Sequence, residues 1–168
     1  MRIILLLVLS LFTSITLAQS TVTTAQTGDW DQESTWSGGS IPSNGDNIVV
    51  ASNHTLTLNV SGVSLRSITI NNNGNFYTDQ DLTITGLSNS EVQGSFYVRS
   101  TVTVSAGDFE IKAANIGASL SAGNISVSPG NQLIFSDSNT NFTVNGNLVI
   151  NSDSQNFGAV LFKGTPSY

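Results

Sequence analysis

Three acidic side chains alternate within five residues near the amino terminus: Asp29, Asp31 and Glu33. Carboxylate oxygens at this spacing can hold Ca²⁺, which takes several oxygen ligands. The segment lacks the longer Asp/Asn–Gly pattern of a defined calcium loop, so carboxylates that support a turn are the alternative. Ca²⁺ is the one cofactor that the sequence suggests, and we expect no other.

Two tryptophans, Trp30 and Trp36, lie in the same short segment. An indole ring with a free face can stack on a sugar, which makes both residues candidate ligand contacts. The alternative is that they cover the open end of an apolar core, and we favour this lid. Glycans or other cell-surface components are the partners that the sugar-stacking alternative suggests.

Nucleophilic catalysis has little support in the sequence. The chain has no cysteine, and His54 is its only histidine. No serine lies in a Gly-x-Ser-x-Gly motif, which would mark an exposed nucleophile. We therefore interpret His54 as a turn residue and predict a protein that is not an enzyme.

Polysaccharide chemistry is the alternative, because glycoside hydrolysis needs two opposed carboxylates. This alternative predicts that two or more acidic residues gather on one face beside an exposed aromatic ring. The candidates are Asp79, Asp81, Glu91, Asp108 and Glu110. The cations that a lyase would need for an acidic sugar form no motif; they are Arg66, Arg99 and Lys112.

The amino terminus has the organisation of a cleavable secretory signal. Arg2 supplies a charge, residues 3–12 are apolar except for Ser10, and small residues lead to Ala18. The apolar run is about half of the roughly 20 residues that a membrane-spanning helix needs. We expect cleavage after Ala18, a secreted or cell-surface location, and no membrane span in the mature chain.

The charge balance excludes one class of partner. The chain has 11 acidic and 5 basic residues, a net charge of −6, and loss of Arg2 with the signal would leave −7. Nucleic-acid binding requires clustered cations, whereas the four that remain are scattered along the chain. We predict no nucleic-acid partner.

Apolar and polar residues alternate with a period of two, which is typical of β-strands. Gly, Asn, Asp and Ser fill the gaps, as turns require. The triplets occupy residues 48–50, 56–58, 68–70, 82–84, 102–104, 125–127 and 148–150. An antiparallel sandwich with many short strands is the alternative fold.

A repeat separates the two folds, because residues 74–85 match residues 94–105 at an offset of 20. Phe76 would then stack on Phe96, and Leu82 on Val102. Fixed periods near this length mark solenoids. We predict an all-β, right-handed parallel β-helix with a signal peptide at 1–18, an N-terminal cap at 19–47 and coils from 48 to 168.

The opening segment carries a family resemblance over residues 28–58. Its pattern is Gly-x-Trp, an acidic stretch, Thr-Trp, Gly-Gly, a Pro, Gly-Asp, a hydrophobic triplet and His-Thr-Leu-Thr. It resembles the start of secreted Bacteroidetes β-helix proteins and, more loosely, the eight-glycine domain of extracellular proteins. The resemblance implies an adhesin-like cell-surface module and implies no reaction.

The carboxyl-terminal end suggests further sequence. A hydrophobic run at residues 158–162 begins another coil, and the chain then ends at Tyr168 without a polar cap. Terminal repeats of solenoids need such a cap. We expect this chain to be the N-terminal part of a longer protein with downstream domains.

Overall fold

The computed structural model describes residues 19–86, 90–105, 109–111, 119–128, 132–135, 141–151, 155 and 159–162. The predicted signal peptide, Asp108, Lys112 and the last six residues lie outside these ranges. Within them, the structure is all β apart from one short 3₁₀ helix, η1 (Glu33–Thr35). No helix in these ranges has the length and apolar character needed to cross a membrane.

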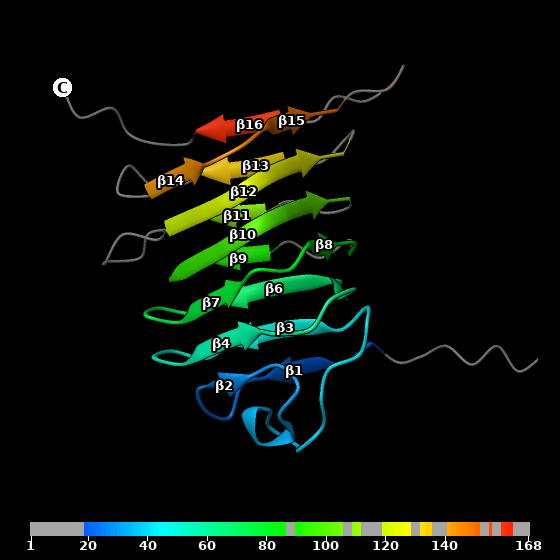
Figure 1. The fold of residues 1–168 in the computed structure, drawn as a ribbon, viewed down its shortest axis with the longest axis vertical. Coiled ribbons are helices and arrows are strands. Elements are labelled where there is room, and N and C mark those ends of the chain that lie inside the picture. The colour runs from blue at the N-terminus through cyan, green and yellow to red at the C-terminus, as the bar shows by residue number, and fades with distance from the viewer. Residues whose placement is uncertain are drawn as a thin grey trace, which may run out of the picture.

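One parallel sheet forms the first face of the molecule (Figure 1). It contains seven strands, which follow one another in chain order along the solenoid axis. They are β1 (Thr21–Thr23), β3 (Asn47–Val50), β6 (Ser67–Ile70), β9 (Ser90–Val92), β11 (Phe109–Ile111), β13 (Gln132–Phe135) and β16 (Ala159–Phe162).

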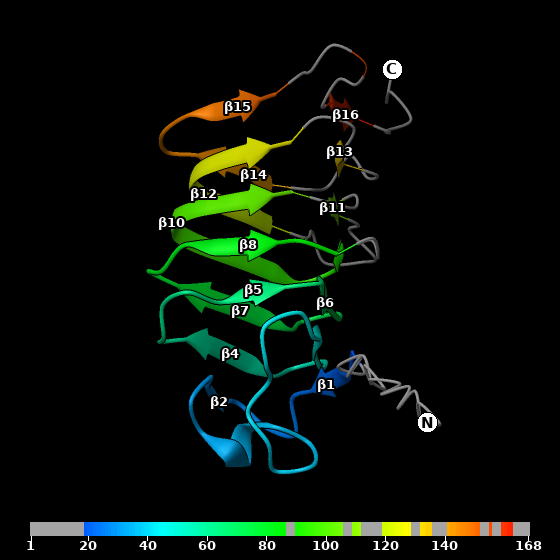
Figure 2. The same ribbon diagram turned by 90° about the vertical axis from the view of Figure 1, so that its right-hand side faces the viewer.

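A second parallel sheet bends around two further faces. The second face holds β2 (Gly28–Asp29), β4 (Thr55–Leu58), β7 (Asn75–Thr78) and β14 (Asn141–Val144). The third face holds β5 (Ser64–Leu65), β8 (Leu82–Ile84) and β15 (Leu148–Ile150), which Figure 2 shows from the side. Two long strands, β10 (Ser95–Val104) and β12 (Ser119–Val127), run across both faces, and their register shifts between Val98 and Thr101 at the corner.

The coils stack into a parallel β-solenoid of about five turns, which confirms the predicted fold class. In Figure 1 the nearer strands β10 and β12 run to the right, the first-face strands behind them run to the left, and the chain climbs from bottom to top. This path is right-handed. The sandwich alternative is wrong, because the strands of both sheets pair in parallel.

The core is a set of side-chain ladders along the solenoid axis. Phe76 and Phe96 are register partners, and their rings stack with centroids 5.2 Å apart and planes at 13°. Leu82 and Val102 are partners as well, as the 20-residue repeat predicts. Both phenylalanines are fully buried. Alternation along each strand therefore places one set of side chains in this core and the other set on the faces.

The first coil begins earlier than the sequence suggested. Strands β1 and β2 lie inside the predicted cap (19–47), yet β1 pairs with β3 and β2 pairs with β4. Both are short, three and two residues, and carry little alternating apolar pattern. The segment that closes the lower end is therefore the turn region around η1, which Figure 1 shows below β1 and β2.

Candidate functional site

Trp30 and Trp36 are buried at the lower end of the core, 3% and 2% exposed. Their ring centroids lie 4.9 Å apart in an edge-to-face arrangement, and Trp36 Nε1 donates a hydrogen bond of 2.8 Å to the carbonyl oxygen of Trp30. A sugar platform requires an open ring face, and neither ring has one. The geometry supports the lid.

The acidic segment stabilises the loop in which it lies. Asp31 accepts hydrogen bonds from the side chains of Asn59 (2.9 Å) and Gln32 (3.1 Å). These bonds, that from Asn59 above all, lower the pKa of Asp31 below its ordinary value. Among the described residues, no group of three or more acidic, histidine or cysteine side chains is placed to hold a metal ion. The proposed calcium ligands Asp29, Asp31 and Glu33 thus gain no support from their arrangement.

His54 lies in the turn between β3 and β4. Its Nδ1 is 2.9 Å from Thr24 Oγ1, which also accepts a hydrogen bond of 3.0 Å from the backbone N–H of Ala51. Thr24 is buried. The histidine therefore joins the end of β1 to the turn above it.

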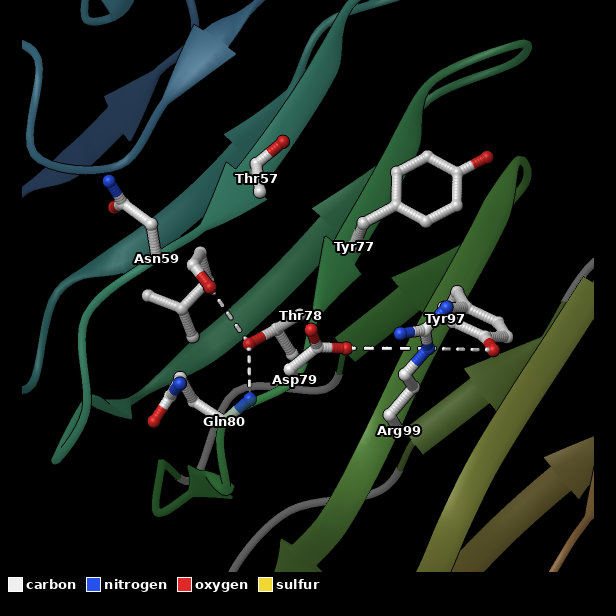
Figure 3. Close-up of a pocket in the computed structure, with 9 residues that line it drawn as sticks. Thr57, Asn59, Tyr77, Thr78, Asp79, Gln80, Tyr97 and Arg99 are labelled. Carbon is white, nitrogen blue, oxygen red and sulfur yellow. Dashed lines mark hydrogen bonds and ion pairs between the residues drawn. The ribbon is translucent and has the colours of Figure 1, made fainter.

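An open groove lies on the second face, with a volume of about 300 Å³. At its centre are Tyr77 of β7 and Tyr97 of β10, which are register partners on adjacent coils and project outward. Their ring centroids are 5.9 Å apart, and Tyr77 is 40% exposed (Figure 3). These two rings on neighbouring coils form a small platform, in which Tyr77 is exposed and Tyr97 is half-buried.

Charged side chains border this platform at the bend toward the third face. Arg99 Nε lies 3.4 Å from an Asp79 carboxylate oxygen, and both side chains are 66% exposed. Arg99 Nε also donates to Tyr97 Oη at 3.3 Å, and its guanidinium carbon is 5.8 Å from the centroid of that ring. The hydrogen bond to Tyr97, followed by the charge of Asp79, raises the pKa of Arg99.

The floor of the groove is fixed by Thr78, which is buried. Its hydroxyl donates to the carbonyl oxygen of Leu58 on the coil below (2.9 Å) and accepts from the backbone N–H of Gln80 (2.8 Å). Figure 3 shows both bonds, below Tyr77 and to the left of Tyr97. Gln80 and Asp79 are consequently held at the rim.

Of the acidic residues that the alternative function requires, Asp79 alone among the described ones lines the groove. Asp81 instead accepts hydrogen bonds from the Ser100 hydroxyl and from the Thr101 backbone N–H. Glu91 and Glu110 lie on the first face, where they are register partners. The predicted gathering of these carboxylates beside an exposed aromatic ring does not occur in the described structure.

The comparison with protein families decides what kind of domain this is. A model of the G8 domain matches residues 35–159, well over half of the chain. The chain belongs to the G8 family. G8 domains occur in extracellular proteins, so the looser of the two resemblances is confirmed. No curated protein and no solved structure matched.

Glycine has a structural role in this G8 domain where coils approach closely. Gly74 and Gly94 precede β7 and β10 on adjacent coils. A Cβ atom on Gly94 would meet the carbonyl oxygen of Gly74, and one on Gly86 would meet that of Arg66. These positions exclude any larger residue while the coils keep their spacing.

The repeat in this G8 domain predicts that Phe76 stacks on Phe96, whereas Tyr77 and Tyr97 are not among the residues that the sequence suggested as ligand contacts. The information was present in the alternation. If Phe76 and Phe96 stack inside, the tyrosine that follows each must point outward. The outward direction of both tyrosines follows directly from the register.

Proposed function

We propose that this G8 domain is a non-catalytic structural module of an extracellular, adhesin-like protein. The proposal rests on the hydrogen bonds that polar side chains form between the described coils. Many of them bind the neighbouring coil, about 20 residues away in sequence, and so hold the solenoid together. A rigid rod that displays its faces at a cell surface is the function that such a design serves best.

These bonds occur on every face of the solenoid. Ser67 Oγ donates to Asn47 Oδ1 at 2.8 Å on the first face, and Ser90 Oγ accepts from the Ile68 backbone N–H at 3.0 Å. On the third face, Thr85 Oγ1 donates to the Leu65 carbonyl at 3.0 Å. Each bond satisfies a polar group between stacked coils, and a satisfied buried group avoids the cost of desolvation.

Export is part of the proposal. Family membership supports an extracellular location, and residues 1–18 have the pattern of a cleavable signal. Protein recovered from the medium or surface of expressing cells should begin at Gln19. Amino-terminal sequencing that finds Met1 retained on the exported protein would contradict this part.

One observation favours the second candidate, a polysaccharide-degrading enzyme. Glu91 and Glu110 are register partners in a parallel sheet, where neighbouring strands lie about 4.8 Å apart. Side chains of register partners on such strands can bring their carboxyl groups near the separation found in retaining glycosidases, about 5–5.5 Å. Two contacts of Glu91 count against this catalytic role. Its Oε1 accepts a hydrogen bond from the Gln93 side chain, and its register partner on the other neighbouring strand is Thr69.

A degradation assay tests the non-catalytic proposal. The purified protein is incubated with a panel of neutral and acidic polysaccharides, while new reducing ends and the absorbance of unsaturated uronates are followed. We expect no product above the rate of a Glu91→Gln/Glu110→Gln double variant. Product formation by the wild-type protein that the double variant lacks would overturn the proposal and establish the enzyme.

A further inference from the structure

We propose that the tyrosine groove on the second face is a binding subsite for an extended, neutral oligosaccharide that lies along the solenoid axis. The inference goes beyond the structural role above, which requires no ligand. It rests on one outward column of side chains, on the groove around two of them, and on the charges at the rim.

The column contains five hydroxyl-bearing residues in successive register positions. Its members, from β4 upward, are Thr57, Tyr77, Tyr97, Ser121 and Thr143. Asp29 of β2 is the register partner below Thr57. Strands in a sheet lie about 4.8 Å apart, which is close to the length of one sugar unit in an extended chain. Successive units of such a chain would each meet one rung of this column.

The two tyrosines supply the apolar part of the subsite. A pyranose ring has faces of C–H bonds that pack on aromatic rings, and tyrosine adds a hydroxyl for hydrogen bonding. The centroids of Tyr77 and Tyr97 are 5.9 Å apart at 54°, so the rings present a shallow trough and not a flat surface. Tyr77 is also among the most exposed large apolar side chains of the described structure.

The rim supplies hydrogen-bonding groups of both kinds. The Asp79 carboxylate accepts, the Arg99 guanidinium donates, and the Asn59 and Gln80 amides do both. Vicinal sugar hydroxyls are donors and acceptors at once, and such a mixed rim suits them. Because Arg99 is already paired with Asp79, the groove has no net positive charge to select an acidic sugar.

The backbone at the groove argues against a peptide ligand. Strands β4, β7 and β10 lie side by side within the sheet, with register partners on both sides of β7. A peptide that binds by strand addition needs a free sheet edge. A ligand on this face can be contacted by side chains alone, as a saccharide would be.

Calorimetric titration of the purified protein tests the inference. The probes are cellohexaose, laminarihexaose, xylohexaose and mannohexaose, with hexagalacturonate as the acidic comparison. We expect at least one neutral hexaose to bind, more tightly than its own disaccharide, and Tyr77→Ala to weaken that binding by about tenfold or more. Tyr77→Phe should retain most of the affinity, because it keeps the ring.

Ile41→Ala is the matched control, since Ile41 is as exposed as Tyr77 (41% against 40%) and does not line the groove. It should bind like the wild-type protein, and circular dichroism should show that every variant is folded. Three results would overturn the inference: no neutral hexaose binds at millimolar concentration, hexagalacturonate binds most tightly, or folded Tyr77→Ala binds as the wild type does. None of these binding results changes the outcome of the degradation assay, so the structural proposal is tested separately.

Discussion

At the scale of single residues, the position of a side chain along its strand decides whether it stabilises the solenoid or faces a partner. Phe76 and Tyr77 are neighbours in β7, yet the first is fully buried and the second is 40% exposed. The stacked pair Phe76–Phe96 fills the core between two coils. Substitution of adjacent residues should therefore have very different consequences.

We predict that Phe76→Ala and Phe96→Ala each lower the free energy of unfolding by about 3–5 kcal/mol, because each deletes a buried ring and leaves a cavity. Tyr77→Ala should cost less than about 1 kcal/mol, as changes at exposed positions usually do. Urea unfolding followed by circular dichroism measures all three. Losses below about 1 kcal/mol for both phenylalanines would show that their stacked rings do not stabilise the core.

Asp81 gives the solenoid a dependence on pH. Hydrogen bonds from the Ser100 hydroxyl and the Thr101 backbone N–H lower the pKa of Asp81 in the folded protein. A carboxyl with a depressed folded pKa contributes stability above its unfolded pKa, about 3.9, and that contribution is lost as the pH falls through the folded value. Asp81→Asn should therefore show a smaller fall in melting temperature between pH 5 and pH 2 than the wild type.

Thermal melts at a series of pH values, recorded by circular dichroism, test this dependence. Ser100→Ala removes the first of the two hydrogen bonds and should move the acid transition of the protein to higher pH. If the melting temperatures of the wild type and Asp81→Asn fell equally across this pH range, Asp81 would not be the source of the pH dependence.

At the scale of elements, glycine sets the spacing between two strands at the point where adjacent coils have no side chain between them. Strand β10 follows Gly94, which lies against the carbonyl oxygen of Gly74 on the coil below. The backbone N–H of Ser95 donates to that same oxygen at 2.9 Å. The glycine pair thus lets the hydrogen-bond ladder of β7 and β10 begin directly after the turn.

Gly94→Ala should separate the starts of β7 and β10 and lower the free energy of unfolding by about 1–3 kcal/mol, the usual cost of an extra methyl group in a packed site. Ser95→Ala is the control, because it changes the next residue but keeps the backbone bond to Gly74. Denaturant unfolding of both variants gives the comparison. Equal stability of the two variants would mean that the coils can move apart freely at this point.

At the scale of the whole molecule, each coil is stabilised by its neighbours, so the two ends depend on what covers them. The lower end is covered by Trp30 and Trp36, which belong to the buried core cluster. Among the residues that the structure describes, this turn region is the part that lies below β1 and β2 in Figure 1. Loss of the lid should therefore affect the first coil before it affects the rest.

We predict that Trp36→Ala accelerates amide hydrogen exchange in β1 and β2 far more than in β7 and β10, because the variant removes both the ring and its hydrogen bond to the Trp30 carbonyl. Exchange measured by mass spectrometry on peptides from each coil resolves the difference. Uniform acceleration along the solenoid would indicate that the protein opens as a single unit and that the lid has no local role.

The sequence by itself determined the solenoid and much of its register. Strict alternation with a period of two requires strands, and an offset of 20 residues places Phe76 on Phe96 and Leu82 on Val102, as the structure shows. The absence of a nucleic-acid partner, which the scattered cations predict on electrostatic grounds, stays a prediction. The repeat predicts the β-helical fold, and the opening motif indicates a domain of the extracellular type.

The tertiary structure decided which rings and which charges are available to a ligand. Trp30 and Trp36 looked like possible sugar contacts in the sequence, but closure of the first coil buries them. The groove is lined instead by Tyr77, which is exposed, and by Tyr97, which is half-buried. Above the regular repeat, Phe96 pairs with Leu120, 24 residues later, so loop lengths and not period set which outward residues align. Alternation reveals that a side chain faces outward, whereas its neighbours on that face depend on how each coil closes.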